Sequence, residues 1–128
     1  MKLPALEDLI DLHAESIARF GGARGLRDRG ALDASLARAG NIVAYGEHGT
    51  DAVDVAVGVC ASICRNHAFI DGNKRIAFLA LGIILELNGF YLDVRENDAI
   101  SAMTKLASSA MSEEEFTNWV RTGVVKAF

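Results

Sequence analysis

Two apolar stretches separated by a short segment rich in polar residues constrain this chain more than any other feature of its sequence. Residues 53–64 form an apolar run that is interrupted mainly by Asp54 and Ser62, and residues 76–85 contain no polar side chain. Apolar residues that extend around most of a helix have to be covered on all sides. We therefore expect two buried central helices with a short polar segment between them.

The polar segment, residues 67–75, reads His-Ala-Phe-Ile-Asp-Gly-Asn-Lys-Arg. It brings an imidazole, a carboxylate, an amide and two cations next to a buried core, where each of these groups needs a partner or water. Such conflicts with local folding rules are frequent at functional sites. The sequence therefore places the candidate site between the two central helices.

The two cations of this segment fall where a helix does not favour them. Asp71 or Asn73 is expected to cap the helix that follows, which puts Lys74 and Arg75 into its first turn. Because a helix N-terminus carries a partial positive charge, two cations there are locally unfavourable. An anion held by free backbone N–H groups and by both side chains would remove this conflict.

The other residues of the segment suit phosphate chemistry. Gly72 lets the backbone approach an anion closely, and the planar guanidinium of Arg75 matches phosphate oxygens. Asp71 supplies a hard oxygen ligand of the kind that magnesium uses when it bridges phosphates. His67 supplies a base that can be neutral near pH 7.

Several residues of the segment also have a simpler structural interpretation. His67 could be a helix C-terminal residue stabilised by the macrodipole. Asp71 could be only a cap, and Asn73 could cap the helix or contact a phosphate. Lys74 could extend to solvent, and Phe69 is expected to anchor the segment in the core in either case. The joint spacing favours the site interpretation for the polar residues.

The segment resembles the signature of the Fic/Doc family, H-x-F-x-[DE]-G-N-G-R-x-x-R. The residues that match this pattern are His67, Phe69, Asp71, Gly72, Asn73 and Arg75. Lys74 replaces the second glycine and Phe78 replaces the last arginine, and both departures are similar to the Doc (death-on-curing) toxin branch. The flanking similarity comprises Leu9-x-x-Leu12-His13, Gly21-Gly22 and Gly25-Leu26-Arg27-Asp28.

The resemblance implies a compact all-α domain with the motif loop between two central helices. Doc-like members are known as protein kinases that phosphorylate elongation factor Tu and arrest translation, whereas classical Fic members transfer AMP. The implied cofactors are ATP and Mg²⁺. His67 would be the catalytic base and Asp71 the metal ligand, and the phosphate-binding residues would be Gly72, Asn73, Lys74 and Arg75.

Two other functions stay open beside the kinase. The same site could transfer AMP to a protein hydroxyl, or the chain could be a non-catalytic phosphate-binding module. Phe78 favours phosphoryl transfer, because one phosphate ligand of the AMP-transferring members is missing and the nucleotide need not bind the same way round.

A toxin of this type needs restraint by a partner. Fic proteins that inhibit themselves carry a helix with the pattern [ST]-x-x-x-E-[GN]. Here Ser109 is followed by Glu113, but position 114 is a second glutamate, so the match is incomplete. We therefore expect a separate antitoxin protein to cover the phosphate cleft near Arg75.

Length and composition indicate one globular domain over residues 1–128. The formal net charge of -4 argues against a nucleic-acid binder, which would usually show a basic stripe. No secretory signal is visible, since Glu7, Asp8 and Asp11 interrupt the first apolar residues. Residues 76–85 are too short to cross a membrane. We expect a soluble cytoplasmic protein.

The two cysteines, Cys60 and Cys64, lie four residues apart on an expected helix. Side chains on one helix rarely meet disulfide geometry, so we expect free buried thiols. A zinc site with His67 is excluded, because Cys60 and His67 would be about 10 Å apart along the helix axis.

Periodicity and capping signals predict about six helices. The expected elements are a helix from Leu6 to Gly21-Gly22, a second capped by Asp28, helices over residues 53–66 and 73–87, the latter stopped by Asn88-Gly89, a fifth capped by Asn97, and a sixth opened by Ser112. Residues 40–50 are expected to form an irregular loop or small flap, and residues 90–92 a short extended piece.

Overall fold

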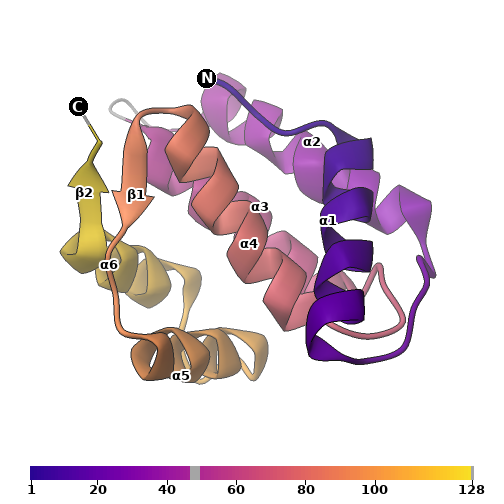
Figure 1. The fold of residues 1–128 in the computed structure, drawn as a ribbon. Coiled ribbons are helices and arrows are strands. Elements are labelled where there is room, and N and C mark those ends of the chain that lie inside the picture. The colour runs from indigo at the N-terminus through magenta and orange to yellow at the C-terminus, as the bar shows by residue number, and fades with distance from the viewer. Residues whose placement is uncertain (47–49, 128) are drawn as a thin grey trace.

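The computed structural model describes residues 1–46 and 50–127, and most of these residues are helical (Figure 1). The described elements are α1 (Leu6–Phe20), α2 (Arg29–Tyr45), α3 (Ala52–Asn66), α4 (Asn73–Leu87), β1 (Phe90–Leu92), α5 (Glu96–Ala107), α6 (Glu113–Gly123) and β2 (Val124–Lys126). The predicted all-α architecture with six helices is confirmed for the described part of the chain. None of its helices combines the length and apolarity that a membrane span requires.

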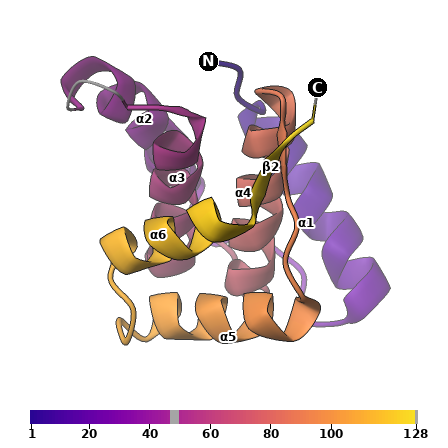
Figure 2. The ribbon, with the colours of Figure 1, turned by 90° about the vertical axis from the view of Figure 1, so that its left-hand side faces the viewer.

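Helices α3 and α4 lie side by side at the centre of the fold (Figure 2). Helix α2 packs against α3, α1 packs against α4, and α5 contacts both central helices. One cluster of buried apolar side chains includes residues of all six described helices. Each fully buried Leu or Ile in it contributes roughly 1.5–3 kcal/mol of transfer free energy. The two segments that the sequence marks as buried therefore do form the core.

Capping explains where two helices begin. Asp28 occupies the N-cap of α2 and accepts a hydrogen bond from the Ala31 N–H. Ser112 and Glu115 form a reciprocal capping box at the start of α6, with both hydrogen bonds at 3.1 Å. Both caps confirm the signals in the sequence.

The prediction of a loop from residue 40 is wrong, because α2 continues to Tyr45. The reason is a close helix contact: a Cβ atom on Gly58 would lie 2.1 Å from Cδ1 of Ile42, so Ile42 fills the space that the glycine leaves on α3. Gly46 then ends α2 by donating its N–H to the Ile42 carbonyl. Residues 47–49 of the predicted flap lie outside the described residues.

The prediction that Asn97 caps α5 is also wrong, since α5 begins at Glu96 with Arg95 in the N-cap position. The preceding residues are fixed by α6, because the Asp93 N–H donates to the Gly123 carbonyl at 2.7 Å. The predicted extended piece is confirmed as β1. It pairs antiparallel with β2, with Leu92 opposite Val124.

The N-terminus of α3 is joined to α6 by charge. Asp51 caps α3 by accepting from the Val53 and Asp54 N–H groups, and Arg121 donates to both Asp51 carboxylate oxygens at 2.9 and 3.1 Å. The hydrogen bond from Arg121 is the main cause that holds the pKa of Asp51 below its ordinary value. Asp51 therefore combines a helix cap with an exposed ion pair.

Replacing Asp51 with alanine should lower the free energy of unfolding by about 1–2 kcal/mol, with about 1 from the cap and up to about 1 from the exposed pair. Asp51→Asn keeps a cap acceptor and should cost less than the alanine variant. Urea unfolding at pH 7 measures both changes.

The advantage of the wild type over Asp51→Asn should disappear in acid. A carboxyl whose pKa is lowered by folding stabilises above its unfolded pKa of about 3.9, and this stability is lost as the pH falls through the folded pKa. Wild-type stability in both variants at pH 7 would contradict the role given to Asp51.

Candidate active site

The loop between the two central helices, residues 67–72, is called the motif loop below. It begins at His67, which ends α3 in the left-handed region with φ 49° and ψ 47°. This conformation is uncommon for a residue with a side chain. It is supported by Arg27, whose Nη2 donates to the His67 carbonyl at 2.5 Å. The imidazole itself is exposed, and none of the described residues hydrogen-bonds to it.

The segment between α1 and α2, residues 21–28, is called the anchor loop. Its Arg27 and Asp28 N–H groups donate to the Ala68 carbonyl at 2.8 and 2.9 Å, and the Gly25 carbonyl accepts from the Ile70 N–H at 3.1 Å. Each such bond contributes about 0.5–1.5 kcal/mol net. The anchor loop therefore holds the motif loop along most of its length.

Asp71 is exposed, and its carboxylate is oriented by backbone donors. Oδ2 accepts from the Ala23 N–H at 3.0 Å, and Oδ1 accepts from the Gly72 N–H at 2.8 Å. These two bonds, Ala23 first, are the main causes that lower the pKa of Asp71. The carboxylate is therefore ionised near neutral pH, and each oxygen keeps lone-pair capacity.

This environment fits a magnesium ion that is held mostly by its substrate. Magnesium commonly binds through one or two carboxylates, with phosphates and water completing the octahedron. Within the described residues, no group of three or more His, Cys, Asp and Glu side chains comes together. Asp71 would thus be a lone carboxylate ligand beside a phosphate site.

Helix α4 begins without a side-chain cap. Its N-cap is Gly72, with φ 74° and ψ 21°, so the prediction of Asp71 or Asn73 as the cap is wrong. The Asn73 amide is committed to Phe69 instead: Oδ1 accepts from the Phe69 N–H at 3.1 Å and Nδ2 donates to the Phe69 carbonyl at 2.9 Å. The first three N–H groups of α4 have no acceptor within the helix.

The two cations of the first turn differ in their surroundings. Arg75 Nη1 donates to the Gly21 carbonyl at 3.1 Å and to Ser16 Oγ at 3.4 Å, and the guanidinium lies 5.6 Å from the Phe20 ring centroid. A guanidinium has five N–H donors, so Nε and Nη2 stay available for a phosphate. Lys74 is exposed and forms no ion pair with the described residues.

All six predicted site residues line one cavity of about 530 Å³. The residues around it are Cys64, His67, Ile70, Asp71, Gly72, Asn73, Lys74, Arg75 and Ala107. The structure thus brings the predicted base, carboxylate and cations to one place. Cys60 and Cys64 are free and buried, as expected, and burial raises the pKa of both thiols.

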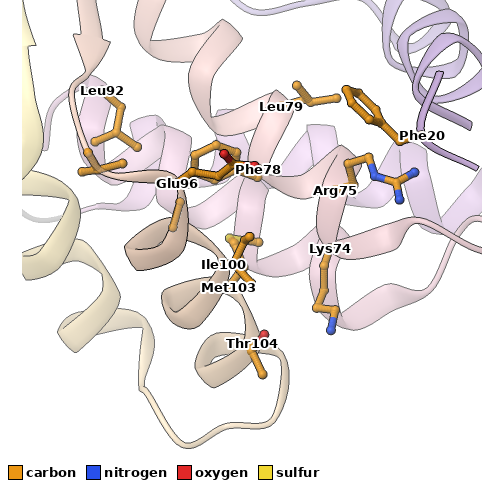
Figure 3. A pocket seen from close by; sticks show the side chains of 12 residues that line it. Phe20, Lys74, Arg75, Phe78, Leu79, Leu92, Glu96, Ile100, Met103 and Thr104 are labelled. Carbon is orange, nitrogen blue, oxygen red and sulfur yellow. The ribbon is translucent and has the colours of Figure 1, made fainter.

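A second cavity, of about 600 Å³, lies between α4, α5 and β1 and is mostly apolar (Figure 3). Its walls include Phe20, Phe78, Leu79, Leu92, Ile100 and Met103. Lys74 and Arg75 line this cavity as well as the first one, so the two cavities meet at these cations. Phe78, which stands where the family pattern has arginine, is therefore part of an apolar wall.

Glu113, the acid of the incomplete inhibitory pattern, does not point at the cations of the site. Its carboxylate pairs with Arg38 at 2.7 Å and with Arg65 at 3.2 Å. It therefore joins α6 to α2 and α3 rather than occupying the cleft near Arg75.

Sequence reasoning missed two supports of the motif loop. Arg27 holds the His67 carbonyl, and the buried His13 contacts both Phe69 and Asp71. The available signals were the glycine-rich anchor loop and the position of His13 on the apolar face of α1. Neither signal shows which partner is reached.

Comparisons with known proteins identify the family of this chain. A family model described as the Fic/DOC family matches residues 3–85, well over half of the chain. This chain belongs to the Fic/DOC family. It is similar to "Toxin Doc" of Mycolicibacterium smegmatis, with 45% identity over 85 residues, and to "Protein kinase doc" of Escherichia phage P1, with 39% identity over 83 residues.

These two alignments cover 63% and 65% of this chain. They span 62% and 65% of the two relatives, which is less than two thirds of each relative's own length. The Fic/DOC match contains the anchor loop, the motif loop and most of α4. The range matched by the family model therefore contains the whole polar segment, residues 67–75, from which the site was predicted.

The close approach of Gly22 to Asp71 gives a test of the carboxylate geometry. A Cβ atom on Gly22 would lie 2.9 Å from Asp71 Oδ2, whereas one on Gly21 would meet nothing within 4 Å. Both glycines have positive φ, so alanine strains the backbone at either position. Gly22→Ala should displace the carboxylate from the Ala23 N–H and raise the pKa of Asp71 towards its ordinary value of about 3.9.

The pKa of Asp71 can be measured by following its carboxyl carbon by NMR during an acid titration. Gly21→Ala is the matched control and should leave that pKa at the wild-type value. The same Asp71 pKa in both variants would show that the Gly22 contact does not orient the carboxylate.

Proposed function

We propose that this protein transfers a phosphoryl group from ATP to a Ser or Thr hydroxyl of a target protein. The observation that carries the proposal is the uncapped N-terminus of α4, whose free N–H groups and two cations face the same cavity as His67 and Asp71. Folding stability alone does not favour this arrangement, because two cations at a helix N-terminus are repelled by the helix dipole.

The phosphates of ATP would lie at this helix end. The N–H groups of Asn73, Lys74 and Arg75 supply backbone donors, and the free side of the Arg75 guanidinium supplies a planar pair of donors. The exposed Lys74 adds a further positive charge. Bound to Asp71, Mg²⁺ would neutralise part of the charge that develops on the phosphate oxygens.

His67 would accept the proton of the incoming hydroxyl. Its imidazole is exposed at the rim of the cavity, so a target side chain can reach it. Phosphoryl transfer depends mainly on positioning and charge neutralisation. The fixed backbone of His67 and the phosphate-binding helix end together supply the positioning.

Phe78 supports transfer of the γ-phosphate rather than of AMP. In the Fic pattern an arginine at this position would face the nucleotide, but here Phe78 lines the apolar cavity. A triphosphate bound in the AMP-transferring direction would therefore lose one cationic ligand. The name of the phage P1 relative, a protein kinase, points in the same direction.

We further propose that the chain acts as the toxin of a toxin–antitoxin pair, with elongation factor Tu as its target in the cytoplasm. The Doc resemblance and the name "Toxin Doc" of the mycobacterial relative support this role. An antitoxin with an apolar segment would fit the cavity beside Arg75. Because Glu113 is committed to Arg38 and Arg65, inhibition from within the chain by this residue is not favoured.

Replacing His67 with alanine should lower the transfer rate by roughly 10²–10⁴, as expected for the loss of a general base. The exposed side chain makes few contacts, so thermal unfolding should be close to that of the wild type. In cells, expression of the wild type alone should arrest growth and the variant should not. A folded His67→Ala protein with wild-type rate would exclude His67 as the base.

ATP labelled at the α- or the γ-phosphorus identifies the group that is transferred. We expect label on elongation factor Tu from γ-labelled ATP only, with the mass increase of one phosphoryl group. Label from the α-position and an adenylyl mass would establish AMP transfer by the same residues. If ATP binds saturably but no protein of a cell extract becomes labelled from either position, the non-catalytic module would be favoured.

A further inference from the structure

His13 is a buried polar residue whose partners lie in the motif loop. It stands on the inward face of α1 between Leu9 and Ile17, and only 3% of its surface is exposed. An imidazole buried among apolar side chains is costly unless its polar atoms are hydrogen-bonded. The contacts of His13 therefore indicate its structural role.

Two contacts connect His13 to the motif loop. Its ring stacks on Phe69 with centroids 3.8 Å apart and an interplanar angle of 15°. Its Nε2 lies 2.7 Å from the backbone oxygen of Asp71. A carbonyl oxygen can only accept, so Nε2 must carry the proton that forms this bond. The ring is thus oriented by both contacts at once.

The Asp71 carbonyl and the Gly72 N–H belong to the same planar peptide unit. His13 holds the oxygen side of this unit, and the Asp71 carboxylate holds the nitrogen side through the Gly72 N–H at 2.8 Å. With both sides held, the plane has a fixed orientation. That orientation determines where the Asp71 carboxylate points and how the chain enters the first turn of α4.

Gly72 is matched to His13 in the same place. A Cβ atom on Gly72 would lie 3.1 Å from Cδ1 of Ile17 and 3.5 Å from Nε2 of His13. The glycine thus lets α1 approach the start of α4 closely enough for the His13 bond. Helix α1 and the phosphate-binding end of α4 are coupled through this one peptide unit.

We propose that His13 is a positioning residue of the active site. Its Nε2–H fixes the Asp71–Gly72 peptide and thereby sets the orientation of the Asp71 carboxylate relative to the start of α4. The consequence for catalysis rests on the proposed function, whereas the structural role does not. His13 is buried and does not line the cavity that contains the proposed phosphate site, so it acts through Asp71.

Two variants separate the hydrogen bond of His13 from its packing. His13→Phe keeps an aromatic ring on Phe69 but has no N–H donor. His13→Gln loses the ring, but its side-chain amide can place a donor near the position of Nε2. Phe116→Leu is the control, because it damages the buried core of α6 and leaves the motif loop contacts intact.

Amide hydrogen exchange of Phe69 and Ile70 reports the order of the motif loop without any substrate. We expect His13→Phe to exchange about tenfold faster at these amides while its melting temperature stays near that of the wild type. His13→Gln should exchange close to the wild-type rate. Phe116→Leu should lower the melting temperature. The ratio of the exchange rates at Phe69 and Ile70 to those at other core amides should stay at its wild-type value.

The transfer reaction provides the second measurement. His13→Phe should lower kcat by about ten- to a hundredfold, because small misplacements of a catalytic group have effects of this size, and should leave KM for the target protein unchanged. His13→Gln should recover most of the lost kcat. Rescue by glutamine would not occur if only the ring packing mattered.

Two results would overturn the proposal: wild-type exchange and kcat in His13→Phe, or a His13→Gln variant as impaired as His13→Phe. If the wild type transfers no group at all, the proposed function fails, and the exchange comparison alone then decides the role of His13.

Discussion

The start of α4 is the constraint on which the site depends, because it places two cations at the positive end of a helix without a side-chain cap. The structure offsets only part of this charge. Arg75 is stabilised by the Gly21 carbonyl and the Phe20 ring, whereas Lys74 stays exposed. An anion at this end would add the missing stabilisation. The phosphate site that we propose at this helix end would explain why the sequence keeps this conflict.

The surroundings of this helix end keep its geometry fixed from the side of α1. The anchor loop hydrogen-bonds to the motif loop backbone, Arg27 holds the His67 carbonyl, and the Ala23 N–H orients Asp71. Nearly all of these contacts are made to backbone atoms. Asn73 closes the loop on Phe69 with both polar atoms of its side chain. Asp71 and Arg75 each use only part of their hydrogen-bonding capacity on the protein, so the rest is left for ligands.

Features that depend on local pattern could be predicted from the sequence. The apolar residues 76–85 predicted α4, and the Ser112 capping box predicted α6. The spacing of the motif predicted that its polar residues form one site, and these residues do line one cavity. Features that depend on distant partners could not. Examples are the Ile42–Gly58 contact that lengthens α2, the pairing of β1 with β2, and the bond from His13 to Asp71, which are 58 residues apart. The N-cap prediction failed for Asp71 because its carboxylate accepts from the distant Ala23 N–H. It failed for Asn73 because the side chain bonds to Phe69, four residues earlier, and the sequence does not show which local bond forms.

An NMR titration of the labelled protein with MgATP is the most direct test of the proposed phosphate site. We expect saturable shifts that are largest at the backbone amides of Asn73, Lys74 and Arg75 and at the side chain of Asp71, since these groups would contact the phosphates and the metal. Saturable binding with its largest shifts elsewhere, or no binding of MgATP at millimolar concentration, would contradict the claim that the start of α4 is the phosphate site.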